Sequence, residues 1–228
     1  MILLTLIGLT SFSQNVNNAE KFKTTKVIRD VGDIKVIILQ IKSLVNNPEI
    51  PLCRAEIIVL KKDRILDSIE FSNIDAVGGN YGLYIDNNLI DGHLIISKYG
   101  DYDGLTLIIN NHGHIFKTVG GRSFVDNSSG LLFSDYDSDL AGLSVFDLNN
   151  DREIMEIIDM EDRPAIFFKT TNNKYYFQGI NDETEKLSLW EIDIVKKKIN
   201  KIEVELPQDK MIKLRQLADY QLLDVTCE

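Results

Sequence analysis

With 228 residues, of which 44% are hydrophobic, the chain can bury a full core, and one repeat domain accounts for its length better than two independent domains. Thirty-five acidic residues against twenty-five basic ones give a formal net charge of −10. That charge argues against binding to nucleic acid or to an anionic membrane surface, because both attract proteins through Lys and Arg. A charged macromolecular partner would therefore present a basic surface.

Residues 1–13 have the pattern of a secretory signal peptide. Ile2–Leu9 is an apolar run, and Ser11-Phe12-Ser13 after it is a small-x-small cleavage pattern ahead of Gln14. The run is too short to span a bilayer as a helix, so we expect no stable membrane insertion. It lacks a preceding Lys or Arg, and a buried first strand is the alternative. The pattern predicts a mature chain in the bacterial periplasm or secreted from the cell.

Strands dominate from Thr25 onward, and the clearest motif is a hairpin at Leu105–Val119. Its β-branched and aromatic residues suit strands, and its Asn-Asn-His-Gly centre suits a tight turn. The same hairpin recurs at Ala55–Ile69, Leu143–Ile157 and Leu187–Ile202. An earlier hairpin precedes each copy, near Val27–Ile38, Tyr84–Ile96, Phe124–Phe133 and Phe167–Phe177. Four strands in each repeat of roughly forty residues is a pattern typical of propeller blades.

This pattern resembles β-propeller-type repeats in architecture, without a family motif such as Trp-Asp. It predicts an all-β fold, a propeller-like stack of about four, or five, four-stranded antiparallel sheets. The domain would cover residues 14–228, with units of about 25–76, 77–118, 119–161 and 162–205 and a closing tail at 206–228. Val77-Gly78-Gly79 and Val119-Gly120-Gly121 mark two junctions, where glycine lets the chain cross closely between sheets. An irregular β-sandwich or one large twisted sheet is the alternative.

Two groups of residues could bind a metal. Asp135, Asp137 and Asp139 alternate as calcium-loop ligands do, although Leu140 replaces the turn glycine and Phe146 the bidentate glutamate. A solvated loop at a strand end is the alternative, since Asp is common there. His112 and His114 flank Gly113, but no third ligand is evident, so polar turn residues are the better interpretation. We therefore expect no cofactor, with calcium at the first group as the alternative.

The aromatic residues concentrate late in the chain. Trp190 stands beyond a cluster formed by Phe167, Phe168, Tyr175, Tyr176 and Phe177. Their spacing along strands favours a place in the core, and a ligand-binding face is the alternative.

No nucleophile elbow, phosphate-binding loop or His-Glu-x-x-His motif is present, and no carboxylate pair stands out as catalytic. We therefore expect a non-enzymatic protein whose acidic surface binds another protein with a basic surface. In general character such a chain resembles immunity proteins that neutralise antibacterial toxins, which implies a toxin-like partner. A carbohydrate- or envelope-binding module would instead expose aromatic residues on one rim. A hydrolase with a carboxylate-lined pocket would bring together two carboxylates with opposed pKa shifts.

The two cysteines, Cys53 and Cys227, both flank strand-like segments. In an exported chain such a pair favours a disulfide over two free thiols. The bond would join the C-terminal tail to the first unit and so close the stack into a ring. Reactive thiols or a bond between two copies are the alternatives.

Overall fold

The computed structural model describes residues 22–43, 53–71, 82–85, 89–99, 105–120, 122–136, 141–181, 183–184, 186–202, 220–222 and 224–226. All regular secondary structure in these residues is β-strand. Within the same ranges, no helix has the length and apolar character that crossing a membrane requires. The all-β prediction is confirmed.

Sixteen of the strands form four antiparallel sheets in chain order. Sheet 1 contains β1 (Phe22–Val31), β2 (Ile34–Ser43), β3 (Cys53–Lys61) and β4 (Arg64–Phe71). Sheet 2 contains β5 (Gly82–Ile85), β6 (Leu94–Tyr99), β7 (Leu105–Ile109) and β8 (Ile115–Val119). Sheet 3 contains β9 (Arg122–Asp126), β10 (Leu131–Tyr136), β11 (Ala141–Asp147) and β12 (Arg152–Met160). Sheet 4 contains β13 (Arg163–Thr170), β14 (Tyr175–Ile180), β15 (Leu187–Asp193) and β16 (Lys198–Ile202). The predicted repeat of four-stranded sheets is therefore confirmed.

Two short strands from the C-terminal tail add to these sheets. β17 (Tyr220–Leu222) pairs with β13 of sheet 4, and β18 (Asp224–Thr226) pairs with β9 of sheet 3, both antiparallel. The strand predicted near the end of the chain is thus present, but it joins sheets 3 and 4, whereas we expected it on the first unit. Cys227 and the side chain of Cys53 lie outside the described residues, so the disulfide stays a prediction.

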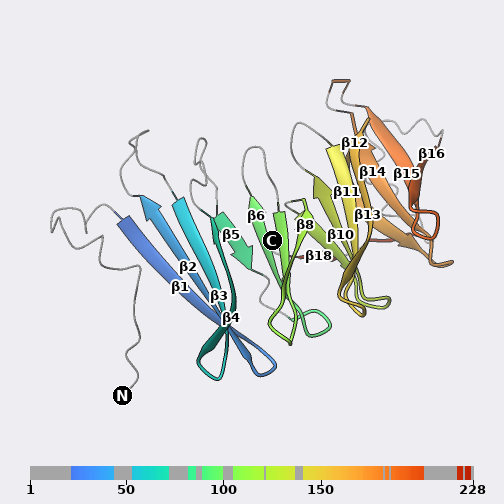
Figure 1. Cartoon of the computed structure of the whole chain (residues 1–228). Coiled ribbons are helices and arrows are strands. Elements are labelled where there is room, and N and C mark those ends of the chain that lie inside the picture. Colours follow the sequence, from blue (N-terminus) through green and yellow to red (C-terminus); the bar gives the residue numbers. More distant parts are fainter. Residues whose placement is uncertain are drawn as a thin grey trace, which may run out of the picture.

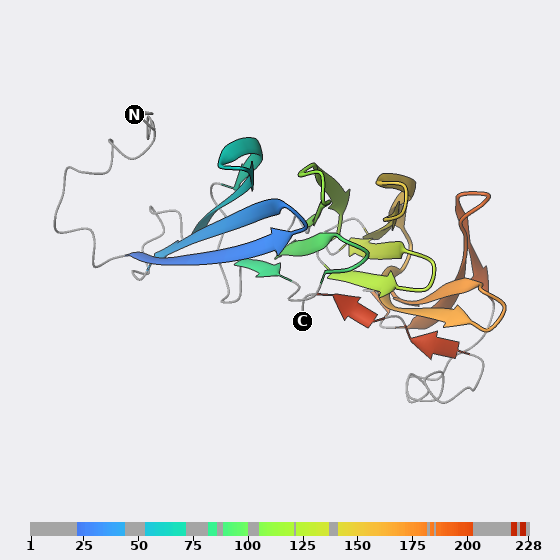
Figure 2. The same cartoon turned by 90° about the horizontal axis from the view of Figure 1, so that it is seen from below.

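Figures 1 and 2 show the four sheets side by side in a row, with sheet 1 (blue) and sheet 4 (orange) at opposite ends. Sheets 2 and 3 are therefore covered on both faces by neighbouring sheets. The tail strands lie along the row at the edge formed by the first strand of each sheet (Figure 2).

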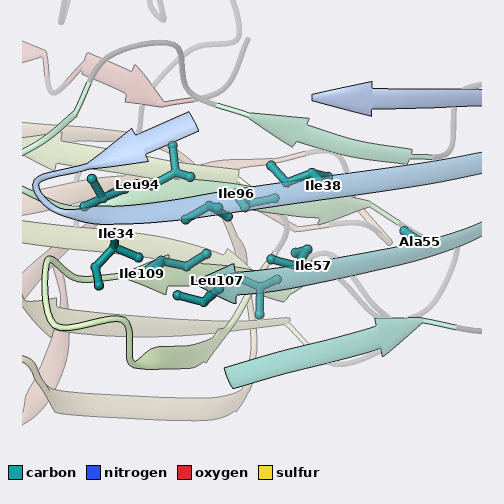
Figure 3. Packing of buried hydrophobic residues seen from close by; sticks show 11 residues of the cluster. Ile34, Ile38, Ala55, Ile57, Leu94, Ile96, Leu107 and Ile109 are labelled. Carbon is teal, nitrogen blue, oxygen red and sulfur yellow. The ribbon is translucent and has the colours of Figure 1, made fainter. Parts of the chain in front are cut away.

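The hydrophobic core lies between successive sheets. Between sheets 1 and 2, side chains from β2 and β3 pack against side chains from β6 and β7 (Figure 3): Ile34, Ile38, Ile57, Leu94, Ile96, Leu107 and Ile109. A second cluster joins sheets 2 and 3: Ile95, Ile108, Val125, Leu132 and Phe146. A third joins sheets 3 and 4: Phe124, Phe133, Leu143, Phe167, Phe177 and Trp190. Because neighbours such as Ile95 and Ile96 point to opposite faces, continuous apolar runs occur where both faces of a sheet are buried.

Gly120 shows why a glycine stands at the junction of sheets 2 and 3. Its φ is +104°, and a Cβ built on it would lie 2.0 Å from the backbone oxygen of Asp135 in β10. No other residue fits this close crossing. The role predicted for glycine is confirmed here, whereas Val77-Gly78-Gly79 lies outside the described residues.

Candidate functional site

The structure places only part of the predicted calcium loop. Asp135 is the penultimate residue of β10 and is fully buried, whereas Asp137 and Asp139 lie outside the described residues. In the ranges given above, no three His, Cys, Asp or Glu side chains come together as a metal site. Calcium binding at this loop therefore stays a prediction.

The three histidines do not share a site. His112 and His114 are exposed in the β7–β8 turn, where Oδ1 of Asn110 accepts hydrogen bonds from both of their backbone N–H groups, at 3.0 and 3.1 Å. His93 is buried and contacts Asp151 across the interface between sheets 2 and 3. The polar-turn interpretation fits the first two, and the cross-sheet contact of His93 had no signal in the sequence.

The aromatic cluster lies in the core, as its strand spacing predicted. Phe167, Phe177 and Trp190 pack between sheets 3 and 4, and the last two rings are stacked with centroids 5.9 Å apart. Phe168 and Tyr176 are buried on the opposite face of sheet 4. Every aromatic side chain that the structure describes is buried or half-buried, so none of them supplies the exposed rim that a carbohydrate-binding module would need.

The most extensive polar cluster joins sheets 3 and 4 around Asp126, at the end of β9. Its carboxylate accepts hydrogen bonds from Lys169 Nζ at 2.7 Å and from the Tyr175 hydroxyl at 2.6 Å, both in sheet 4. The hydroxyl groups of Ser128 and Ser129, in the β9–β10 turn, donate to the two carboxylate oxygens at 2.7 Å each. Asp126 and the side chain of Lys169 are nearly buried, with 7% and 11% of their side-chain surface exposed.

These contacts determine the charge states of the cluster. Burial by itself would raise the pKa of Asp126, but the hydrogen bonds from Lys169, Tyr175, Ser128 and Ser129 outweigh it and hold that pKa well below its usual range. Burial, together with the bond to the Asp126 carboxylate, raises the pKa of Tyr175 to about 12. At neutral pH the carboxylate is therefore ionised and the phenol is protonated.

Ser128 and Lys169 have the spacing of a nucleophile and its base, since Nζ lies 2.6 Å from the serine Oγ. A lysine base must be neutral to take a proton from serine. Here the same Nζ lies 2.7 Å from Oδ2 of Asp126, with which it forms a salt bridge. Through its bonds to Asp126 and Ser128, Lys169 joins sheet 4 to sheet 3.

A second buried carboxylate, Asp162, lies at the start of sheet 4. Its Oδ2 accepts hydrogen bonds from the Ser188 hydroxyl at 2.5 Å and from the Trp190 indole at 3.0 Å, and Lys201 Nζ lies 3.2 Å away. Burial would raise the pKa of Asp162, but the bonds from Ser188, Lys201 and Trp190 outweigh it and lower that pKa. Gly179 makes room for the cluster, because a Cβ there would meet Asp162 and Ser188 at 2.8 Å. Asp126 and Asp162 thus both accept hydrogen bonds from side chains within the chain.

The excess of acidic over basic residues lies in the middle of the sequence. Residues 77–161 contain fourteen acidic and four basic residues, a net charge of −10 that equals that of the whole chain. On the outer edge strand of sheet 3 and just after it, four exposed carboxylates and the side chain of Ile158, whose exposure is 56%, lie within nine residues: Glu153, Glu156, Asp159 and Glu161 are the acids. In the described part of the chain β12 pairs only with β11. We call these five residues the acidic edge.

Sequence reasoning found the net charge of the chain but missed its location. A count of charged residues in each unit would have located the two acidic middle units, because it needs only the sequence. The edge itself depends on which residues of β12 the sheet leaves exposed. No protein-family model matches the chain, and a search of the curated proteins finds no significantly similar sequence.

Proposed function

We propose that the protein is an exported, non-enzymatic binding protein that covers a basic patch on another protein, as an immunity-type inhibitor does. The observation that carries the proposal is the acidic edge, where four exposed carboxylates and the exposed side chain of Ile158 occur within nine residues on and just after one edge strand. Exposed apolar side chains near charged ones are common in protein-binding surfaces.

The distribution of charge supports the same reading. Outside residues 77–161 the acidic and basic residues balance at twenty-one each. The field of the chain therefore originates in its middle units and would steer a basic partner towards sheets 2 and 3. Asp126 and Asp162 are buried and bonded within the chain, whereas the carboxylates of the acidic edge are exposed to a partner, although Glu153 also accepts a hydrogen bond from Ser144 and Glu161 pairs with Lys201.

The test compares two variants with the same change in net charge. Glu153→Gln/Glu156→Gln neutralises the acidic edge, and Asp30→Asn/Asp63→Asn neutralises two exposed acids of sheet 1. Immobilised wild type and variants are incubated with an extract of the encoding organism, and bound proteins are identified by mass spectrometry. We expect a basic protein to be retained by the wild type and the sheet 1 variant and lost from the edge variant.

The salt dependence of that complex gives a second measurement. Exposed charges are screened beyond about 8 Å at physiological ionic strength and beyond about 3 Å at 1 M. Association measured by surface plasmon resonance should therefore slow as salt is raised. A partner that binds the edge variant as well as the wild type, or an on-rate that ignores salt, would contradict the proposal.

A further inference from the structure

The first strands of the four sheets form one edge of the row. They differ in whether a further strand pairs with them at that edge. β13 and β9 each receive an added antiparallel strand from the tail, β17 and β18 respectively. In the part of the chain that the structure describes, β1 of sheet 1 pairs only with β2. It is a ten-residue strand with one edge lacking a strand partner.

The turn that follows β1 shows which of its backbone groups lie along that edge. Gly32 and Asp33 form a two-residue turn between Val31 and Ile34, which are paired across the hairpin. The pair that flanks a two-residue turn exchanges backbone hydrogen bonds, and the pairs alternate from there. The N–H and C=O groups of Thr24, Lys26, Ile28 and Asp30 therefore point away from β2.

One side-chain contact agrees with this direction. The Arg29 guanidinium donates a hydrogen bond of 3.1 Å to the carbonyl oxygen of Ile28, so this carbonyl is bonded by a side chain. The Ile28 side chain is 46% exposed on the face of sheet 1 that points away from sheet 2. The edge therefore offers both backbone groups and an apolar side chain.

The charge of sheet 1 indicates what fits there. β1 carries Lys23, Lys26 and Arg29 against one acid, Asp30, and the described residues of sheet 1 contain nine basic and six acidic residues. Lysine on an edge strand opposes pairing with a second copy, since two such strands would bring like charges together. An acidic strand meets no such repulsion.

We propose that the edge of β1 binds an extended segment of another protein, in which carboxylates alternate with apolar residues, by adding it as a fifth strand to sheet 1. Backbone hydrogen bonds to the outward groups of β1 supply affinity. Because an alternating segment places its carboxylates on one face, Lys26 on one face of β1 or Lys23 on the other selects them, according to the register. The tail strands on β9 and β13 are the same mode of association within the chain. This surface is separate from the acidic edge and has the opposite charge preference.

The test uses the full chain and two capped ten-residue peptides, one alternating valine with glutamate and one alternating valine with lysine. Amide exchange is followed by NMR. On addition of the glutamate peptide, exchange at Thr24, Lys26, Ile28 and Asp30 should slow by about tenfold or more. The lysine peptide should leave these four amides unchanged.

Four variants test where the peptide binds and what selects it. Ile28→Pro removes an outward N–H, which an edge strand tolerates, and should abolish binding, while Ile28→Thr keeps the N–H and should still bind. Lys23→Glu/Lys26→Glu leaves the backbone unchanged and should reverse the preference between the two peptides. Circular dichroism checks that each variant is folded. The acidic-edge variant Glu153→Gln/Glu156→Gln should bind the glutamate peptide as the wild type does, which separates this proposal from the previous one.

Four outcomes would overturn the proposal. Equal binding of both peptides by the wild type would show that charge does not select the strand. Undiminished binding to folded Ile28→Pro would place the peptide elsewhere. Slow exchange of the four amides before any peptide is added would show that the chain covers its own edge. A wild-type dimer that Ile28→Pro converts to a monomer would show that a second copy takes it.

Discussion

His93 of sheet 2 and Asp151 of sheet 3 are joined by a 2.6 Å contact between Nε2 and Oδ1. The other ring nitrogen, Nδ1, lies 2.9 Å from the carbonyl oxygen of Asp91, so both ring nitrogens face hydrogen-bond acceptors. Asn110 donates a further bond of 2.7 Å to Oδ2 of Asp151. A single carboxylate thus bonds two side chains of the neighbouring sheet, much as Asp126 bonds Lys169 and Tyr175 between sheets 3 and 4.

Replacing Asp151 with alanine should loosen the interface between sheets 2 and 3. The change leaves the buried His93 ring and the Asn110 amide without their partner, which should lower the free energy of unfolding by about 1–3 kcal/mol. Urea denaturation followed by circular dichroism measures the loss. Glu156→Ala, an exposed site in the same sheet, is the control and should change stability by less than about 0.5 kcal/mol. Equal effects of the two changes would contradict a structural role for the contact.

Replacing Asp126 with alanine should cost more, because it leaves the ammonium group of Lys169 in a nearly buried place without its counter-charge. Removing one partner of a buried ion pair typically costs about 3–5 kcal/mol. The exposed pair of Lys174 and Glu191 gives a matched control, and Lys174→Ala should cost no more than about 1 kcal/mol. A small effect of Asp126→Ala in urea denaturation would mean that Lys169 finds solvent without its partner. The double variant Asp126→Ala/Lys169→Met should recover part of the loss, since it removes both charges.

The same cluster predicts how stability depends on pH at both extremes. The pKa of Asp126 is lowered in the folded state, so its contribution is present above the ordinary value of 3.8 and is lost as the pH falls through the lowered pKa. The pKa of Tyr175 is raised from 10.0 to about 12, so its contribution is present below pH 10 and is lost as the pH rises towards 12. Urea midpoints measured from pH 2 to 12 should fall at both ends. Tyr175→Phe should flatten the alkaline fall, and an unchanged alkaline limb would contradict the assignment.

The two glycines with positive φ at positions 120 and 92 test the close crossing between sheets. Gly120→Ala should destabilise the fold by more than about 3 kcal/mol, because its Cβ would collide with the backbone of Asp135 in addition to adopting a strained φ. Gly92 has a φ of +77° but nothing within 4 Å of a Cβ, so Gly92→Ala should cost only about 1 kcal/mol. Thermal unfolding of both variants compares them directly. Similar melting temperatures would contradict the steric argument.

The sequence by itself determined the strands and their local pairing. The hairpin at Leu105–Val119 and its copies became β7–β8, β3–β4, β11–β12 and β15–β16, because β-branched residues around Asn, Asp and Gly turns encode a hairpin within fifteen or so residues. Continuous apolar runs such as Leu94-Ile95-Ile96 lie where both faces of a sheet are buried. The aromatic residues of sheet 4 were placed in the core on the same grounds.

Only the tertiary structure decided where the sheets and the tail lie relative to one another. Whether Tyr220–Leu222 joins the first sheet or the last depends on which sheet edge lies beside it. These edges are far from it in sequence, so the pattern of neighbouring residues does not predict the pairing. The bonds from Asp126 to Lys169 and from Asp151 to His93 span 43 and 58 residues, and each depends on how two sheets stack. The acidic edge and the edge of β1 arise in the same way, because exposure is a property of the stack and not of the strand.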